Sequence, residues 1–116
     1  VVGTLYRPHD NIYQVREALE ALCRRINALP NPFTKLLVAI AGVSYLQPFG
    51  DGNKRTGRVL GNALLIHHRC CPLSYRSVDE VLYKKAMILF YEQHSLALFK
   101  RLMLEQYRFA VDHYFL

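Results

Sequence analysis

The stretch QPFGDGNKRTGR, residues 47–58, carries most of the information about the fold and function of this chain. It follows an almost wholly apolar segment; glycines flank Asp51 on both sides, and three cations come after it. Backbone N–H groups at the start of a helix have no partner within the helix, and glycine lets an anion approach them closely. The pattern therefore predicts a phosphate-binding loop between two helices.

Helical signals precede this loop. Apolar residues recur at three-to-four-residue spacing from Ala18 to Leu29 and predict a helix that ends before Pro30. Asn31 followed by Pro32 is a typical helix start, and the apolar run behind it predicts a buried helix to about residue 46. The loop is therefore expected to begin where the most buried helix ends.

Three more helices are predicted after the start of the loop. Residues 59–66 have helical apolar spacing and predict a third helix that stops near Cys71-Pro72. Ser77 and Glu80 have the spacing of a capping box, which predicts a fourth helix beginning there. The same apolar periodicity predicts a last helix from about Ser95.

The N-terminal region has a different pattern. Two short β-prone pieces, residues 5–7 and 12–15, flank the turn composition of residues 8–11 and predict a β-hairpin. The expected fold is all-α, a compact helical bundle with this short hairpin at its N-terminus. Residues 1–116 are expected to form a single domain, and because the chain lacks an initiating Met we expect an excised or truncated core.

Composition limits the partners and the location. A net charge of +6 favours anionic partners, but the basic residues recur along predicted helices as solvated faces, so nucleic acid is not an expected partner. Three cysteines, two of them adjacent, imply no disulfide framework and favour a cytoplasmic location. The longest apolar run, residues 36–46, is shorter than the roughly 20 residues that cross a bilayer, so no membrane association is expected.

The loop is not of the Walker type, because the spacing GxxxxGK[ST] is absent and a predicted helix, not a strand, precedes it. It resembles instead the signature of the Fic/Doc family, HPFx[DE]GN[GK]RxxR, with which eleven of the twelve positions are compatible. Residues 3–15 are similar to the flap hairpin on which such proteins dock a target segment. The resemblance implies a Fic-type bundle that uses ATP and Mg²⁺ to transfer AMP to a Ser, Thr or Tyr hydroxyl of a target protein.

The same resemblance implies a role for each loop residue. Asp51 is implied as the Mg²⁺ ligand, in keeping with the hard oxygen ligands that this ion prefers. Asn53 and Arg58 are implied to take part in catalysis together with Asp51 and position 47. The nucleotide-binding residues that the family implies are Gly50, Gly52, Asn53, Lys54, Arg55, Thr56 and Arg58 in the signature, and Tyr83 near the adenine. From its place on an amphipathic helix alone, Tyr83 is expected to be a packing residue.

Position 47 departs from the family pattern, which has a histidine that acts as the general base. The amide of Gln47 cannot take up a proton near neutral pH, although it can hydrogen-bond a hydroxyl or a phosphate. A positioned base contributes about 10²–10⁴-fold to a rate, so we expect nucleotide binding to persist while transfer is impaired. Two readings stay open: a weak adenylyltransferase, and a catalytically dead pseudo-enzyme that binds nucleotide or target. Whether the glutamine is natural or engineered is also open.

Lys54 adds a further alternative. Many members of the family have glycine there, whereas Doc-type toxins carry lysine and act as protein kinases on a translation factor. Many adenylyltransferase-like members share the sequence DGNKRTGR, so AMP transfer is the preferred activity. The family's inhibitory-helix motif, [ST]xxxE[GN]N, does not occur in this chain, so an inhibitory helix could lie upstream, on an antitoxin partner, or nowhere.

Overall fold

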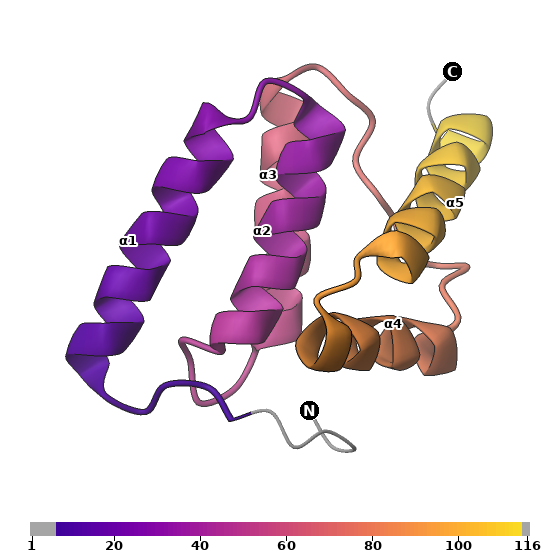
Figure 1. Cartoon of the computed structure of the whole chain (residues 1–116). Helices are drawn as coiled ribbons and strands as arrows, with labels where there is room; N and C mark the ends of the chain where they lie inside the picture. The colour runs from indigo at the N-terminus through magenta and orange to yellow at the C-terminus, as the bar shows by residue number, and fades with distance from the viewer. Residues whose placement is uncertain (1–6, 115–116) are drawn as a thin grey trace.

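The computed structural model describes residues 7–114, which fold into five helices (Figure 1). The helices are α1 (Ile12–Ala28), α2 (Pro32–Leu46), α3 (Asn53–His67), α4 (Glu80–Gln93) and α5 (Ala97–Tyr114). The prediction of an all-α bundle is confirmed for this part of the chain. None of these helices is both long enough and apolar enough to cross a membrane.

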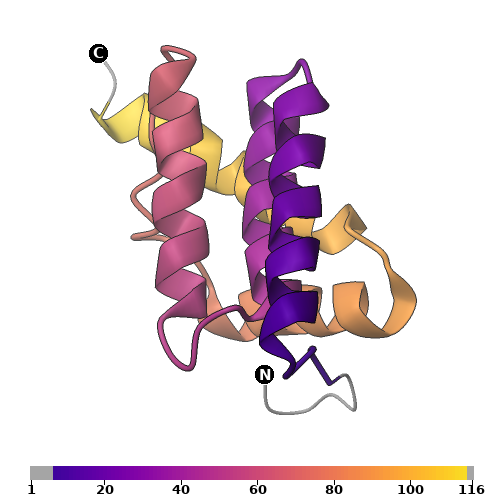
Figure 2. The ribbon, with the colours of Figure 1, turned by 90° about the vertical axis from the view of Figure 1, so that its left-hand side faces the viewer.

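The helices are arranged around α2. α1, α2 and α3 run alongside one another with alternating directions, and α2 packs against both of the others (Figures 1 and 2). α4 runs across the end of this group at which α2 finishes and α3 begins, and α5 turns back from it (Figure 1). α2 packs against each of the other four described helices, and the loop that follows it lies at the end of the bundle that α4 crosses (Figure 1).

The start and the burial of α2 agree with the sequence prediction. The Asn31 side chain accepts hydrogen bonds from the backbone N–H groups of Phe33 and Thr34, and Pro32 occupies the first helical position. The core gathers on this helix and its neighbours; its largest fully buried side chains are Leu36, Ile40, Leu65, Phe99 and Met103. The apolar run thus forms a central helix of a globular protein.

A buried lysine joins α1 to α2. Lys35 is only 8% exposed, and its ammonium donates to the carbonyl oxygens of Ile26 and Asn27, at 2.7 and 3.5 Å, in the last turn of α1. Carbonyl groups at a helix end lack partners within the helix and carry partial negative charge. The Lys35 ammonium on α2 therefore provides hydrogen bonds to the backbone carbonyl groups at the end of α1.

α3 approaches α2 closely through two buried glycines one turn apart. A Cβ at Gly57 would lie 3.5 Å from Ile40 Cα, which is ordinary contact. A Cβ at Gly61 would overlap the Cδ1 of Leu36, a fully buried side chain. The absence of a side chain at Gly61 is therefore required by the packing of the two helices that flank the signature loop.

The predicted N-terminal hairpin is wrong where the structure describes it. Residues 12–15 form the first turn of α1, because the Asn11 side chain accepts from Tyr13 N at 2.8 Å and Gln14 N at 3.3 Å. Ile12 and Tyr13 are 73% and 77% exposed, so the β-prone side chains have no sheet partner. No strand occurs within residues 7–114, and residues 3–6 of the expected flap lie outside the described range.

The cap of α4 also differs from the prediction. Asp79, not Ser77, is the N-cap, and its Oδ1 accepts from the N–H groups of Val81 and Leu82. The hydroxyl of Ser77 instead pairs with the side-chain nitrogen of Gln106 on α5, at 3.1 Å. Glu80 therefore lies in the first turn of the helix with its carboxylate available for other contacts.

Candidate functional site

The signature loop, residues 47–52, turns the chain through two left-handed residues. Gln47 ends α2 with φ 45° and ψ 59°, and its N–H donates to Val43 O at 2.9 Å. Gly52 has φ 82° and precedes α3, a conformation that glycine adopts without steric cost. The helix–loop–helix prediction is confirmed, and Gln47 lies at the C-terminal end of the central helix.

Asn53 fastens this loop from the first residue of α3. Its Oδ1 accepts from Phe49 N at 3.0 Å, and its Nδ2 donates to Phe49 O at 2.9 Å. Both backbone groups of Phe49 are thus bound by one side chain. The Asn53 amide shapes the loop directly and retains one N–H for another acceptor.

The first turn of α3 has the properties of an anion site. Gly52 provides no side-chain cap, and no acidic residue lies in this turn. Thr56 N bonds to Gly52 O at 2.9 Å, whereas the N–H groups that precede it in a helix have no internal acceptor. Together with the helix dipole, these groups attract negative charge. Thr56 is half-buried and belongs to this turn through its backbone.

A pocket of about 430 Å³ opens beside this turn, between α2, α3 and α4. It is lined by Ser44, Gln47, Asn53, Lys54, Glu80, Tyr83, Lys84 and Met87. Four of the predicted site residues are thus brought together from three helices. A volume of this size falls in the range of roughly 300–1,000 Å³ that is usual for small-molecule sites.

The other predicted site residues do not line this pocket. Gly50 meets no atom within 4 Å of an added Cβ and lies at the open edge of the loop. The Asp51 carboxylate is 96% exposed, and its ion pair is to Arg55 at 3.5 Å. Gly50 and the Asp51 carboxylate therefore both lie in solvent near the start of α3.

Arg58 is held between two aromatic rings. Its guanidinium carbon lies 4.4 Å from the ring centroid of Tyr75 and 4.6 Å from that of Tyr83, and its Nε is buried without a hydrogen-bond partner among the described residues. The side chain is 17% exposed. Stacking of this kind fixes the guanidinium plane.

Tyr83 combines both roles expected for it. The residue is 4% exposed, so it packs in the core, yet its ring also lines the pocket. Burial raises the pKa of its hydroxyl, against the opposing charge of Arg58. The tyrosine therefore stays neutral and serves as an apolar wall with a polar tip.

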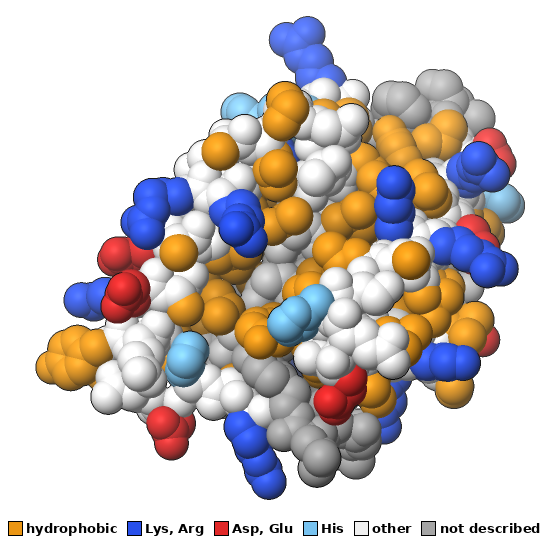
Figure 3. Space-filling view, in the orientation of Figure 1, with side chains coloured by type: hydrophobic (Ala, Val, Ile, Leu, Met, Phe, Trp, Pro, Cys, Tyr) orange, Lys and Arg blue, Asp and Glu red, His pale blue; other side chains and the backbone are white. Residues whose placement is uncertain are grey.

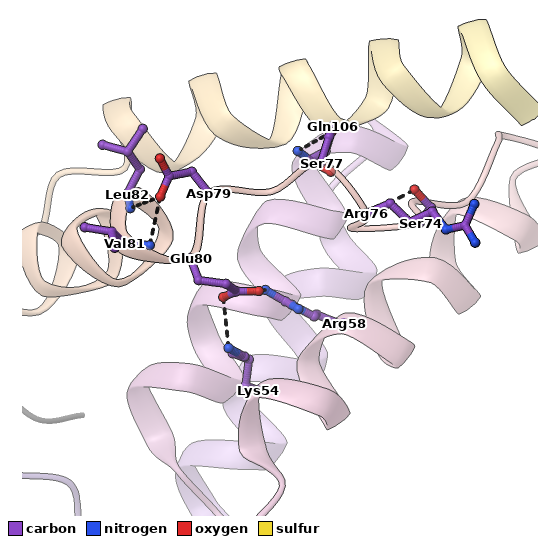
Figure 4. Close-up of polar contacts among 10 residues, drawn as sticks. All are labelled: Lys54, Arg58, Ser74, Arg76, Ser77, Asp79, Glu80, Val81, Leu82 and Gln106. Atoms are coloured by element: carbon purple, nitrogen blue, oxygen red, sulfur yellow. Dashed lines mark hydrogen bonds and ion pairs between the residues drawn. The ribbon is translucent and has the colours of Figure 1, made fainter.

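Glu80 is the functional candidate that sequence reasoning missed. Its Oε2 lies 3.0 Å from Lys54 Nζ, and its Oε1 lies 3.3 Å from Arg58 Nη2 (Figure 4). Burial acts to raise the pKa of this carboxyl, but the Lys54 hydrogen bond and the charge of Arg58 outweigh it and lower the pKa. The Ser-x-x-Glu spacing predicts only a capping role for residue 80, and nothing local in the sequence links it to the signature.

A second hollow lies between α1, α2 and α4, on the face where hydrophobic side chains gather in Figure 3. Its volume is about 660 Å³, and most of its lining is aliphatic or aromatic. Ligand sites usually combine an apolar wall with a few convergent polar groups. The smaller pocket beside α3 has those groups and is therefore the better candidate.

The comparisons with known proteins agree with the signature. Residues 2–65, more than half of the chain, match the family model described as Fic/DOC family. Searches of curated proteins and of solved structures gave no significant match. The matched residues include the signature stretch up to Arg58 and most of α3, so the chain belongs to the Fic/DOC family.

Proposed function

We propose that this protein is a Fic-type adenylyltransferase domain that binds ATP in the pocket between α2, α3 and α4, and whose transfer activity is impaired by Gln47. The observation that carries the proposal is that Gln47, Asn53, Lys54 and Tyr83 line one pocket at the uncapped start of α3. An aromatic wall next to a cationic helix N-terminus suits a nucleotide, whose base is flat and whose phosphates are anionic.

The chemistry explains why position 47 matters. A target hydroxyl oxygen forms a bond to the α-phosphorus of ATP, while the bond from that phosphorus to the bridging oxygen breaks and pyrophosphate leaves. The hydroxyl proton must pass to an acceptor during this step. The Gln47 amide can orient the hydroxyl but does not accept the proton at neutral pH. A slow reaction or none is therefore expected from the unmodified chain.

The residues present fit a Mg²⁺ ion. Mg²⁺ is commonly held by one or two carboxylates together with substrate phosphates and water. The Asp51 carboxylate is nearly free in solvent beside the anion site, with one contact to Arg55 at 3.5 Å, so it can offer a hard oxygen ligand. When bound, the ion would neutralise phosphate charge next to Lys54.

Gln47→His is the direct test. We expect this variant to transfer label from α-labelled ATP with Mg²⁺ to itself or to proteins of a lysate. Gln47→Asn is the matched control, because it keeps an amide in a left-handed position and supplies no base. If Gln47→His binds ATP but transfers no AMP, the adenylyltransferase proposal fails and the chain is a nucleotide-binding pseudo-enzyme.

Lys54 supports a second candidate, a Doc-like kinase, because this lysine lines the pocket at a position where many members of the family have glycine. The position of the label separates the two activities. Transfer from α-labelled ATP indicates adenylyl transfer, and transfer from γ-labelled ATP indicates phosphoryl transfer. The partners that either activity implies are a target protein segment and an inhibitory helix or antitoxin, and the proposed location is the cytoplasm.

A further inference from the structure

Tyr75 lies in the connection between α3 and α4, beyond the residues 2–65 that match the family model. Its ring lies against Arg58, the last residue of the signature, with 4.4 Å between the ring centroid and the guanidinium carbon. Tyr83 on α4 contacts the same guanidinium at 4.6 Å. The attraction between a cation and an aromatic ring is stronger where water is excluded, and the Arg58 side chain is only 17% exposed. The connection therefore supplies one of the two rings that hold this arginine.

The backbone of Tyr75 is held in an uncommon conformation. Its φ is 60°, in the left-handed region that residues with bulky side chains seldom adopt. Such a conformation persists only where the surrounding structure holds it. On one side Asn62 binds both backbone groups of Leu73, at 2.8 and 2.9 Å. On the other side Ser77 accepts a hydrogen bond from the Gln106 amide on α5, at 3.1 Å (Figure 4). The segment is therefore fastened on both sides of the residue that carries the ring.

The hydroxyl of Tyr75 does not account for this arrangement. It is buried and has no hydrogen-bond partner within the described part of the chain. Burial raises the pKa of this hydroxyl above its ordinary value, and Tyr83 adds to the rise against the charge of Arg58, so the group is neutral. A buried hydroxyl without a partner lowers stability. The ring of Tyr75, and not its polar tip, therefore provides the interaction with Arg58.

The position of Arg58 bears on the pocket beside α3. Its Nη2 lies 3.3 Å from Glu80, which lines that pocket, whereas its Nε is buried. One edge of the guanidinium is thus directed to the pocket side. Arginine binds phosphate oxygens through N–H groups in a fixed planar geometry. A guanidinium that is already ordered loses less conformational entropy when it binds a ligand.

We propose that Tyr75 is a positioning residue of the phosphate site, and that its ring holds the Arg58 guanidinium in place for an anionic ligand. The inference rests on the proposed nucleotide function and adds a residue outside the signature that sets the affinity for phosphates. Tyr75 does not line the pocket, so its effect on a ligand passes through Arg58. This indirect route gives the proposal a sharp test.

The test measures the binding of inorganic tripolyphosphate to the whole chain by isothermal titration calorimetry. Tyr75→Leu should bind it about fivefold more weakly than the unmodified protein, which is the size expected for the loss of one cation–π contact. Tyr75→Phe keeps the ring and should bind like the unmodified protein. In an Arg58→Met background, Tyr75→Leu should have no further effect.

Tyr107→Leu is the structural control. Tyr107 is another half-buried tyrosine, and its ring stacks on Phe33, with 6.3 Å between the centroids. Its loss should leave the affinity for tripolyphosphate unchanged. Thermal unfolding of each variant establishes that it is folded.

A second readout needs no ligand. The buried Nε–H group of Arg58 gives an NMR signal whose chemical shift depends on the aromatic rings beside it. Tyr75→Leu should move this signal, whereas Tyr75→Phe should leave it close to its place in the unmodified protein. An unmoved signal in Tyr75→Leu would mean that the ring does not hold the guanidinium, and the proposal would fail.

Three binding results also overturn the proposal. Unchanged affinity in Tyr75→Leu, or equal weakening in Tyr75→Phe, would mean that the ring does not position Arg58. The same loss in the Arg58→Met background, or in Tyr107→Leu, would mean that the substitution acts through the fold in general. These outcomes leave the Gln47→His transfer assay untouched, whereas absence of tripolyphosphate binding by the unmodified protein and every variant would remove the anion site and both proposals.

Discussion

Asn53 binds both backbone groups of Phe49 through its side-chain amide, at 3.0 Å from Phe49 N to Oδ1 and 2.9 Å from Nδ2 to Phe49 O. Asn62 repeats the arrangement with Leu73, at 2.8 Å from Leu73 N to Oδ1 and 2.9 Å from Nδ2 to Leu73 O. α3 thus uses one asparagine to hold the loop before it and another to hold the segment after it. The same chemistry fixes both connections to the helix.

Asn53→Ala should loosen the signature loop and weaken nucleotide binding. Two hydrogen bonds of about 0.5–1.5 kcal/mol each are lost, which corresponds to roughly tenfold weaker binding of ATP. Calorimetric titration measures the effect, and Arg24→Ala, on the exposed face of α1, is the control. Equal ATP affinities for the two variants would show that Asn53 does not order the site.

The paired glycines of α3 predict opposite outcomes for the same substitution. Gly61→Ala should lower the free energy of unfolding by about 1–3 kcal/mol, because the new methyl group overlaps buried Leu36. Gly57→Ala should leave it unchanged or raise it by up to about 1 kcal/mol, because the contact with Ile40 is ordinary and alanine favours the helix. Urea denaturation compares them, and equal destabilisation would contradict the packing described here.

Lys35→Met should destabilise the protein through the end of α1. The substitution keeps an apolar side chain of similar length and removes the ammonium that donates to Ile26 O at 2.7 Å. Leu29 N still donates to this oxygen, so we expect a loss of about 1–2 kcal/mol. The urea midpoint gives the measurement. Lys84→Met, at an exposed lysine, is the control, and an equally small effect for both would show that the buried ammonium contributes nothing.

The ion pairs of Glu80 predict that the free energy of unfolding depends on pH in the acidic range. Burial acts to raise the pKa of this carboxyl, but the Lys54 hydrogen bond and the Arg58 charge lower it below its ordinary value of 4.5. A group whose pKa is lowered in the folded state stabilises the protein above the unfolded pKa, and this contribution is lost as the pH falls through the folded pKa. The stability difference between the unmodified protein and Glu80→Gln should therefore be constant from pH 7 to about 5 and change below 4.5. A difference that stays constant down to pH 3 would show that Glu80 does not titrate with these partners.

The sequence predicted the elements best where local signals and burial agreed. Asn31 and Pro32 mark the start of α2 by a cap and a fixed φ, and the apolar run behind them matches its place in the core. The strand prediction for residues 12–15 was wrong because it rested on β propensity, which is weak where side chains are exposed. The Asn11 cap starts a helix there instead. The N-cap of α4 was predicted wrongly because Ser77 and Asp79, two residues apart, are both residue types that cap helices.

The site was predictable in its loop and unpredictable in its surroundings. The signature named Gln47, Asn53 and Lys54, and all three line one pocket. Glu80 and its two cations are separated by more than twenty residues, and only the crossing of α4 over the start of α3 brings them together. A pairing of this kind depends on tertiary structure, so no local pattern reveals it.

The left-handed backbone at residue 47 has a consequence for how the activity can change over time. The conformation arises from the end of α2, and histidine is among the residues that adopt it more readily than most. Glutamine and histidine codons differ only in their third base. Under the proposed function, one transversion would therefore add or remove the proton acceptor without rebuilding the loop, and a single mutation would separate an enzyme from a binding protein.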